Sequence, residues 1–347
     1  MKFKINFKQP LIYLLQVLLI CNACTNNTNN HRAFYFWRSS FALSQNESKM
    51  LLNLKVNKLY IHFFDIKFDG NAKTDIPEAI VKFNNDSLPS VEIIPVVYIE
   101  NMVLKNKGDS ACRILASKTV TLINKICSYK KITPHEIQFD CDWTESTKST
   151  YFKFIKISKE LLQQNIELTV TLRLHQIKYP LLTGIPPVAR GTLMFYNMGN
   201  FNPAESDNSI LNLNLAKDYI NSLKDYPLSL NIALPLYSWA VVFRNDKPIE
   251  ILHEFDKNSV SSLPDLKPLN KNVFIASAGF YFNSVYIQQN DILKIEEIVP
   301  AQLHQAAQML AENVKKENRT IIFFDLNEKI FSRISRPEME TVYNSFN

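Results

Sequence analysis

Two carboxylates on one predicted strand, Asp140 and Asp142, are the residues best placed to do chemistry. Side chains alternate along a strand, so both carboxylates share a face with Gln138 while the apolar residues between them share the other. Acids this close couple their titrations, and one of them can keep the raised pKa that a general acid requires. The alternative is a structural polar pair neutralised by Arg173 from the next predicted strand.

Other predicted strands also end in polar residues, and all three tryptophans lie at or just past strand ends. A carboxylate that follows apolar strand residues must stay hydrated or be paired, and an indole offers a flat face for a sugar ring. The candidate catalytic residues are Asp140, Asp142 and Glu145. The candidate substrate-binding residues are Trp37, Arg38, Asp65, Glu100, Trp143, Arg173, His175, Tyr196, Asn197, Trp239 and Asp325. The alternative for each of these residues is a structural role, as a hydrogen-bonded residue of a loop or of the core.

Eight predicted strands would position these residues, at 31–38, 59–64, 92–99, 136–141, 167–174, 191–197, 229–234 and 320–324. Helices are predicted at 44–54, 109–129, 150–164, 214–223 and 301–316, and from Pro337 to about Phe346. This alternation predicts an α/β fold, a (β/α)8 TIM-type barrel over residues 34–347 with functional residues at the carboxyl ends of its strands. The helices after the second and fifth strands have little support, and a doubly wound sheet is the alternative.

A long segment, residues 237–300, separates the seventh strand from its helix. It contains strand patterns of its own, including two that flank the turn-forming residues Arg244 to Pro248. A connection of this length needs its own structure. We therefore expect a small β-rich insertion over the mouth of the barrel.

The amino terminus resembles a bacterial lipoprotein signal. Residues 1–23 combine three lysines with an apolar run too short to span a membrane, and Cys24 would be the lipidated residue. An ordinary signal peptide or an uncleaved anchor is the alternative. Residues 24–33 form an Asn/Thr-rich tether, so we expect a lipid-anchored protein of the cell envelope, at the outer membrane or cell surface.

The composition of the chain argues against several classes of binding partner and cofactor. Cleavage after residue 23 would reduce the net charge from +6 to +3, which gives no case for nucleic acid. Only six glycines are present, and the sequence contains neither a G-x-G-x-x-G loop nor a Walker-type phosphate-binding loop. No cofactor or metal is expected, and Cys112, Cys127 and Cys141 are predicted to be buried packing residues.

The strand-four residues resemble the D-G-x-D-x-D-x-E motif of family 18 glycoside hydrolases, the chitinase-like barrels. Asp140 and Asp142 match its second and third acids, and Met194-Phe195-Tyr196-Asn197 is similar to the family's M-x-Y-D. The family also often carries an insertion after strand seven. More closely, the chain resembles Bacteroidetes-type lipoproteins that share such a barrel. The resemblance implies that Asp142 and Tyr196 would contact the acetamido group of a sugar.

The sequence departs from the family pattern where the proton donor should be, because Thr144 replaces the final Glu. Ile137, Gln138 and Asn197 replace the first Asp, the Gly and the strand-six Asp. One hypothesis is an exported glycoside hydrolase with an atypical carboxylate pair. Asp140 or Asp142 would form one side of the pair, and the other side would be Glu145, Glu100, Asp65 or Asp325. The alternatives are a glycan-binding lipoprotein without catalysis and a lipoprotein whose insertion binds another protein.

Overall fold

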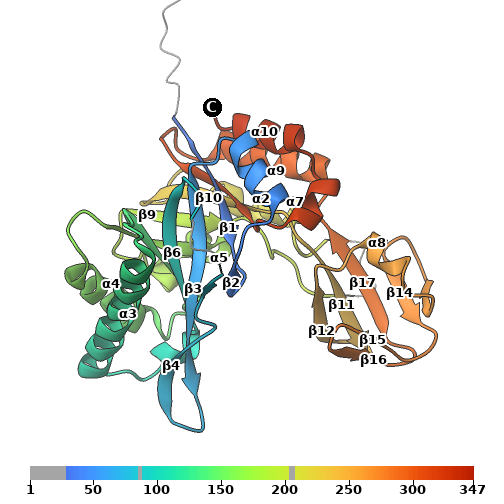
Figure 1. Cartoon of the computed structure of the whole chain (residues 1–347), viewed down its shortest axis with the longest axis horizontal. Helices are drawn as coiled ribbons and strands as arrows, with labels where there is room; N and C mark the ends of the chain where they lie inside the picture. Colours follow the sequence, from blue (N-terminus) through green and yellow to red (C-terminus); the bar gives the residue numbers. More distant parts are fainter. Residues whose placement is uncertain (1–28, 85–87, 203–207) are drawn as a thin grey trace, which may run out of the picture.

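The computed structural model describes residues 29–84, 88–202 and 208–347; the predicted signal peptide and Cys24 lie outside them. Eight parallel strands form a closed barrel in the order β1-β18-β10-β9-β8-β7-β6-β3, and β1 pairs with β3 to complete the circle (Figure 1). The strands are β1 (His31–Phe36), β3 (Lys58–Asp69), β6 (Glu92–Ile99), β7 (Glu136–Asp140), β8 (Glu167–Arg173), β9 (Arg190–Met194), β10 (Ser229–Pro235) and β18 (Thr320–Phe324). The predicted TIM-type barrel is confirmed, and the doubly wound sheet is excluded.

Helices cover the outside of the barrel. They are α2 (Gln45–Asn53), α3 (Asp109–Lys130), α4 (Lys148–Leu161), α5 (Leu174–Lys178), α6 (Pro180–Thr183), α7 (Leu213–Ile220), α9 (Pro300–Asn313) and α10 (Arg336–Asn344), with 3-10 turns η1 (Asn101–Leu104) and η2 (Glu328–Ser332). Ser44 begins α2 with the expected capping box, its hydroxyl accepting from the backbone of Glu47. The weakly supported helix after strand five is only the short α5 and α6.

No helix follows the second barrel strand directly. Instead β3 runs past the barrel and turns back as β4 (Thr74–Glu78), which pairs antiparallel with Asp65–Asp69. The turn is stabilised by Asp69, whose carboxylate accepts from the backbone amides of Asn71 and Ala72. The prediction that this strand ends at Phe64 was therefore wrong, because hairpin pairing continues it. A short pair, β2 (Ser40–Phe41) with β5 (Lys82–Phe83), lies beside it.

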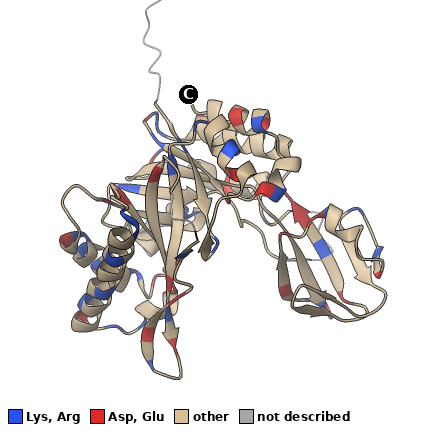
Figure 2. Ribbon diagram, viewed as in Figure 1, with Lys and Arg blue, Asp and Glu red and all other residues tan. Residues whose placement is uncertain are grey.

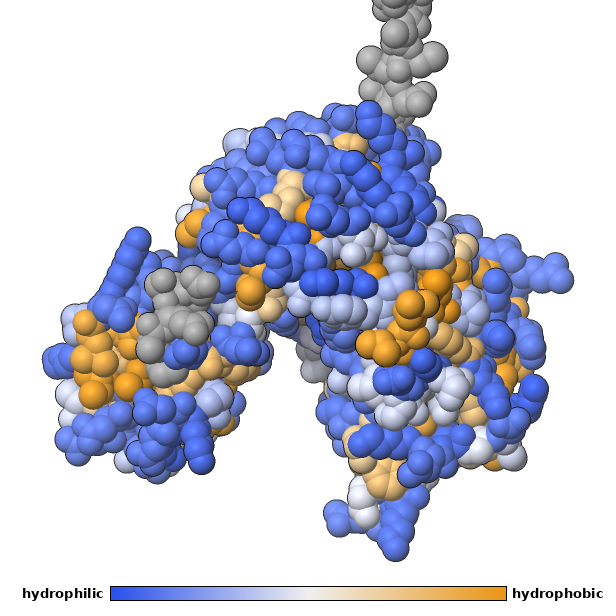
Figure 3. Space-filling view, turned by 180° about the vertical axis from the view of Figure 1, so that it is seen from behind, coloured by the Kyte–Doolittle hydropathy of each residue, from blue (hydrophilic) through white to orange (hydrophobic). Residues whose placement is uncertain are grey.

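The segment after β10 forms the expected β-rich insertion. Its five-stranded antiparallel sheet has the order β12-β11-β17-β14-β13, with β15 and β16 as a separate hairpin. The bounds are β11 (Ser238–Arg244), β12 (Lys247–His253), α8 (Lys257–Val260), β13 (Leu266–Pro268), β14 (Val273–Ala276), β15 (Phe280–Phe282), β16 (Val285–Ile287) and β17 (Ile292–Glu297). It has a small core of its own, built around residues such as Val242, Phe255 and Leu293. A notch separates the insertion from the rest of the molecule, seen from behind in Figure 3.

Apolar side chains of β7 point outward and polar ones point into the barrel, as the alternation in the sequence predicted. Phe139 points outward and packs on Phe154 of α4, with ring centroids 5.0 Å apart. Gln138 points inward, where it accepts from the Tyr35 hydroxyl and donates to Thr192 over 2.9 Å. The three described cysteines are buried and free, as expected.

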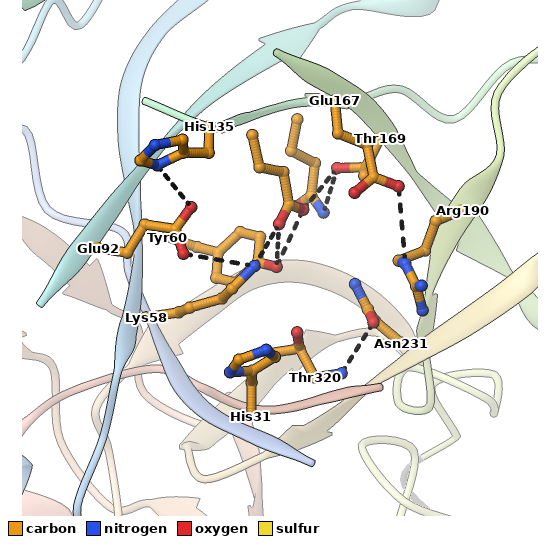
Figure 4. A network of polar contacts seen from close by, with 12 residues as sticks. His31, Lys58, Tyr60, Glu92, His135, Glu167, Thr169, Arg190, Asn231 and Thr320 are labelled. Carbon is orange, nitrogen blue, oxygen red and sulfur yellow. Dashed lines mark hydrogen bonds and ion pairs between the residues drawn. The ribbon is translucent and has the colours of Figure 1, made fainter. Parts of the chain in front are cut away.

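A polar network fills the amino end of the barrel (Figure 4). The carboxylate of Glu136 accepts from Lys58 over 2.9 Å, from the Tyr60 hydroxyl over 3.0 Å and from Thr169 over 2.9 Å. Each of these polar groups is thereby satisfied inside the barrel, so burial is not prohibitive. Buried side chains of this network occupy the lumen at this end.

The amino end of the barrel also carries both ends of the described chain. Asn30 donates to the backbone oxygen of Phe346, next to the carboxyl terminus. The carboxyl ends of the strands, hereafter the barrel mouth, lie at the opposite end. Lysine and arginine residues occur together with aspartate and glutamate on both the barrel and the insertion (Figure 2). No helix within the described ranges is long and apolar enough to cross a membrane.

Candidate functional site at the barrel mouth

A bidentate ion pair joins the ends of β7 and β8 at the barrel mouth. The guanidinium of Arg173 donates from Nε to Asp142 Oδ1 over 2.6 Å and from Nη2 to Oδ2 over 3.2 Å. Burial acts against the charge of Arg173, but the hydrogen bonds of Asp142 and the negative charge of Asp140 outweigh it, so the pKa of Arg173 is raised. The sequence left open whether Arg173 neutralises the carboxylates of Asp140 and Asp142. In the structure it pairs directly with Asp142, whose side chain remains half exposed.

Asp140 lies one layer deeper than Asp142 and is almost fully buried. One of its carboxylate oxygens accepts from the Thr171 hydroxyl over 2.6 Å. Burial raises the pKa of Asp140, and the charge of Asp142 adds to the shift while Arg173 opposes it. The two acids therefore differ: Asp142 is exposed and paired, whereas Asp140 is buried and resists ionisation.

Two residues that were not predicted from the sequence lie on the same side of the barrel, Tyr98 on the neighbouring strand β6 and His62 on β3, the strand after it. Tyr98 of β6 pairs in register with Asp140, and burial together with the charges of Asp142 and Asp140 raises the pKa of Tyr98 to about 12. His62 of β3 is buried, and its Nε2 lies 2.6 Å from Asp65 Oδ1. Alternation in the predicted strands could have shown that Tyr98 and His62 face the lumen.

Asp65 belongs to this group rather than to an open rim position. Burial would raise its pKa, but the hydrogen bond and charge of His62 and the proximity of Lys67 outweigh burial, and the pKa of Asp65 is lowered. The carboxylate is therefore held ionised between two cation-forming side chains.

An aromatic cluster forms the floor of the barrel mouth. It consists of Tyr35, Trp37, Tyr196, Tyr237 and Phe324, and the other four rings surround Phe324 with centroids 5.5–5.8 Å from it. Trp37, Tyr237 and Phe324 are partly exposed, whereas Tyr35 and Tyr196 are buried. Phe324 and Tyr237 were not among the residues predicted from the sequence, although Phe324 ends the last predicted strand.

Tyr196 and Asn197 take up different roles in this cluster. The Tyr196 hydroxyl lies in the buried layer and donates to the sulfur of Met194 over 3.3 Å. Asn197 is exposed with a positive φ of 56°, a conformation that asparagine tolerates better than most residues. Its side-chain oxygen accepts from the Tyr237 hydroxyl, which fixes the Tyr237 ring at the mouth.

Asp325 follows Phe324 and stands apart from the Asp140–Asp142 pair. Burial raises the pKa of Asp325 to about 6, with the negative charge of Glu254 adding to the shift and Arg38 opposing it. No ion pair or side-chain hydrogen bond with another described residue is formed by its carboxylate. Burial raises the pKa of the Tyr237 hydroxyl, the charge of Arg173 opposes this shift, and the charge of Asp325 adds to it. Charged groups on both sides of the mouth therefore act on Tyr237.

Two tryptophans are not available to a ligand, which corrects the expectation that all three would line the mouth. Trp143 is 1% exposed, stacks on Tyr151 and donates from Nε1 to the backbone oxygen of Thr183. It follows the outward face of β7, so it packs against α4. Trp239 is 6% exposed and donates from Nε1 to Glu296 at the base of the insertion.

Arg38 and Glu100 are also engaged in structural contacts. Arg38 donates to both carboxylate oxygens of buried Glu47 over 2.9 and 3.0 Å. Glu100 accepts from the backbone amide of Phe68 in the β3–β4 hairpin. These contacts stabilise the loops around the mouth, and neither side chain is part of the aromatic floor.

The loop after β7 does not supply a proton donor at the family position. Thr144 is exposed, and its hydroxyl lies 3.0 Å from that of Ser146. Glu145 is exposed in the turn before α4, and no contact brings it to Asp140 or Asp142. His175 lies on the exposed side of α5, and the partial removal of water from around its ring lowers its pKa. Among the described residues, no group of three His, Cys, Asp or Glu side chains could hold a metal ion.

Comparisons with known proteins bear on this geometry. The sequence matches no family model and none of the curated proteins. The structure is similar to the spore cortex-lytic enzyme SleL of Bacillus megaterium, with a TM-score of 0.57 and 14% identity over 93% of this chain and 76% of that one. It is similar to a chitinase from Chromobacterium violaceum, with a TM-score of 0.51 and 12% identity over 88% and 98% of the two chains.

A third similar structure is a GH18 chitinase from Cycas revoluta in complex with (GlcNAc)4 (TM-score 0.51, 11% identity, 91% of this chain and 100% of that chain). The chain has the fold of the family 18 chitinases. At these identities the likeness establishes the chitinase-like fold alone. Whether the chain shares their chemistry depends on the residues at its own mouth.

Proposed function

We propose that this protein binds a glycan at the barrel mouth. The observation that carries the proposal is the aromatic cluster, in which Phe324 is surrounded by four rings and three rings of the cluster are partly open. Flat aromatic faces bury the C–H surface of a sugar at low entropic cost. The exposed carboxylate of Asp142, fixed by Arg173, supplies an oriented hydrogen-bond acceptor for sugar hydroxyl or amide groups beside that floor.

The residues of the mouth favour binding over hydrolysis by the route of the resembled family. A proton donor must reach the leaving oxygen, and Thr144 has no acidic proton to give. Both carboxylate oxygens of Asp142 accept hydrogen bonds from the guanidinium of Arg173, and Asp140 is buried beneath it. Glycan binding without turnover is the function that we infer from this arrangement.

Replacing Trp37 with alanine is expected to weaken glycan binding about tenfold, because an indole that stacks on a sugar contributes roughly 1.4 kcal/mol. Calorimetry with hexameric oligosaccharides, including those of N-acetylglucosamine, measures this loss. Tyr129→Ala is the matched control, since Tyr129 is 80% exposed on α3. Equal affinities of the wild type and both variants would contradict the proposal, as would the absence of binding to every oligosaccharide.

Hydrolysis is the second candidate function, favoured by the contrast between Asp140 and Asp142. A buried acid with a raised pKa beside a second, exposed carboxylate is the arrangement from which glycosidases build an acid and a stabilising carboxylate. Release of reducing ends from a glycan panel that Asp140→Asn and Asp142→Asn both abolish would support this candidate. Turnover that survives both substitutions would remove it.

We also propose that the protein is lipid-anchored in the cell envelope through Cys24. The sequence supports this through its signal-like start, and the described chain begins at the amino end of the barrel. A tether attached there would present the mouth away from the membrane. Loss of the protein from the membrane fraction in a Cys24→Ser variant is the expected result; unchanged membrane association would contradict it.

A further inference from the structure

A second cavity lies beside the barrel mouth, between the end of β18 and the insertion. This cavity, hereafter the Asp325 cleft, has a volume of about 460 Å³ and is lined by residues that include Tyr237, Glu254, Asp325, Lys329 and Arg333. Tyr237 belongs to both sites, because its ring also contacts Phe324 at a centroid distance of 5.8 Å. A glycan lying on the aromatic cluster can therefore continue along Tyr237 into the cleft.

Nearly every charge in the Asp325 cleft has a partner of opposite sign. Lys329 donates to Glu254 over 2.6 Å, which fastens the end of the barrel to the insertion. Arg333 donates to Glu297 over 3.2 Å and lies 3.8 Å from Asp256. Asp325 is the exception.

The nearest cation outside the cleft is not available to Asp325. Arg38 acts on Asp325 only through space, because its guanidinium donates to Glu47. The cleft itself contains three carboxylates, those of Glu254, Asp256 and Asp325, against the two cations Lys329 and Arg333. Apart from the imidazole of His253, which also lines the cleft, this leaves one negative charge, and Asp325 is the carboxylate that forms no ion pair with any described residue.

We propose that the Asp325 cleft binds a cationic amino sugar, a hexosamine unit whose amine is free rather than acetylated, within the glycan held at the barrel mouth. The inference rests on the proposed function and narrows its ligand. A protonated amine donates up to three hydrogen bonds and supplies the missing positive charge. An acetamido group would leave this half-buried carboxylate without a counter-charge, which costs binding energy.

Calorimetry near pH 6.5 with hexamers of glucosamine and of N-acetylglucosamine tests the proposal on the full protein. The wild type is expected to bind the glucosamine hexamer more tightly, and Asp325→Asn to lower that affinity about tenfold while changing the affinity for the acetylated hexamer less than twofold. Asp225→Asn is the matched control, because Asp225 is exposed near the start of β10. Higher salt should weaken the wild-type preference, a readout that does not depend on any variant folding.

The outcomes separate the inference from the function beneath it. A wild type that binds the acetylated hexamer equally well or better, with no effect of Asp325→Asn, overturns the amino-sugar site and leaves glycan binding standing. A wild type that binds neither these hexamers nor any other oligosaccharide overturns both. Loss of the preference in Asp325→Asn but not in Asp225→Asn establishes the site.

Discussion

The Arg173→Met variant is expected to lose about 3 kcal/mol of unfolding free energy at pH 8, the cost of removing one partner from a partly buried ion pair. Arg173 is the cation that neutralises Asp142 directly and acts on Asp140 beneath it. Without it, a buried carboxylate and its charged neighbour would face each other uncompensated. Methionine keeps the apolar stem, so packing contributes little to the loss.

The pH dependence of the unfolding free energy tests whether the loss in Arg173→Met is electrostatic. The pKa of folded Asp140 is raised above its unfolded value, so this group's contribution to stability is fully present at low pH and is lost as pH rises through the folded pKa. Loss of Arg173 raises that pKa further, and the deficit of the variant should therefore grow from pH 4 to pH 8. Urea unfolding at several pH values measures it.

Two further variants complete the experiment. The Asp142→Asn substitution, added to Arg173→Met, should recover part of the loss because it removes one of the two facing charges. Arg190→Met is the matched control, since Arg190 lies 3.7 Å from Glu167 at the exposed amino end and should cost less than about 1 kcal/mol. A deficit for Arg173→Met that is the same at every pH would contradict the electrostatic explanation.

Replacing Asp325 with asparagine is expected to stabilise the protein by about 2 kcal/mol at pH 8. The pKa of Asp325 is about 6 in the folded protein against a usual value near 3.8, so folding becomes less favourable as pH rises between these values. Asparagine has a similar shape and carries no charge to desolvate. The gain should disappear near pH 4, where the wild-type carboxyl is largely protonated in the folded state.

Thermal unfolding of both proteins from pH 4 to pH 8 measures this crossover. The exposed Asp225→Asn variant should change stability by less than about 0.5 kcal/mol throughout. A wild type more stable than Asp325→Asn at pH 8 would show that Asp325 has a favourable partner in the folded protein. A stabilised variant that also loses amino-sugar binding would indicate a residue retained for a ligand at a cost in stability.

Much of the fold follows from local patterns in the sequence. The strand predicted at 92–99 and that at 320–324 have the bounds found in the structure, because short apolar runs between polar residues mark buried parallel strands. The second strand was predicted too short, since nothing local distinguishes a barrel strand from one that continues into a hairpin with Thr74–Glu78.

The inward direction of Asp140 and Asp142 also follows from the sequence alone, because side chains of a strand alternate between its two faces. The same rule places Trp143 on the outer face, where α4 covers it. The position of Trp143 just past a strand end had suggested a ligand-facing side chain, and the structure supports the alternation rule instead.

What surrounds each carboxylate was decided by tertiary structure. The sequence determined a barrel, its insertion, and a set of acids at strand ends. Only folding placed Arg173 on Asp142 and Arg38 on Glu47, and left Asp325 without an ion pair among the described residues. Partners in a barrel come from strands and loops far apart in the chain, and charge pairing depends on distances of a few ångströms that no local pattern encodes.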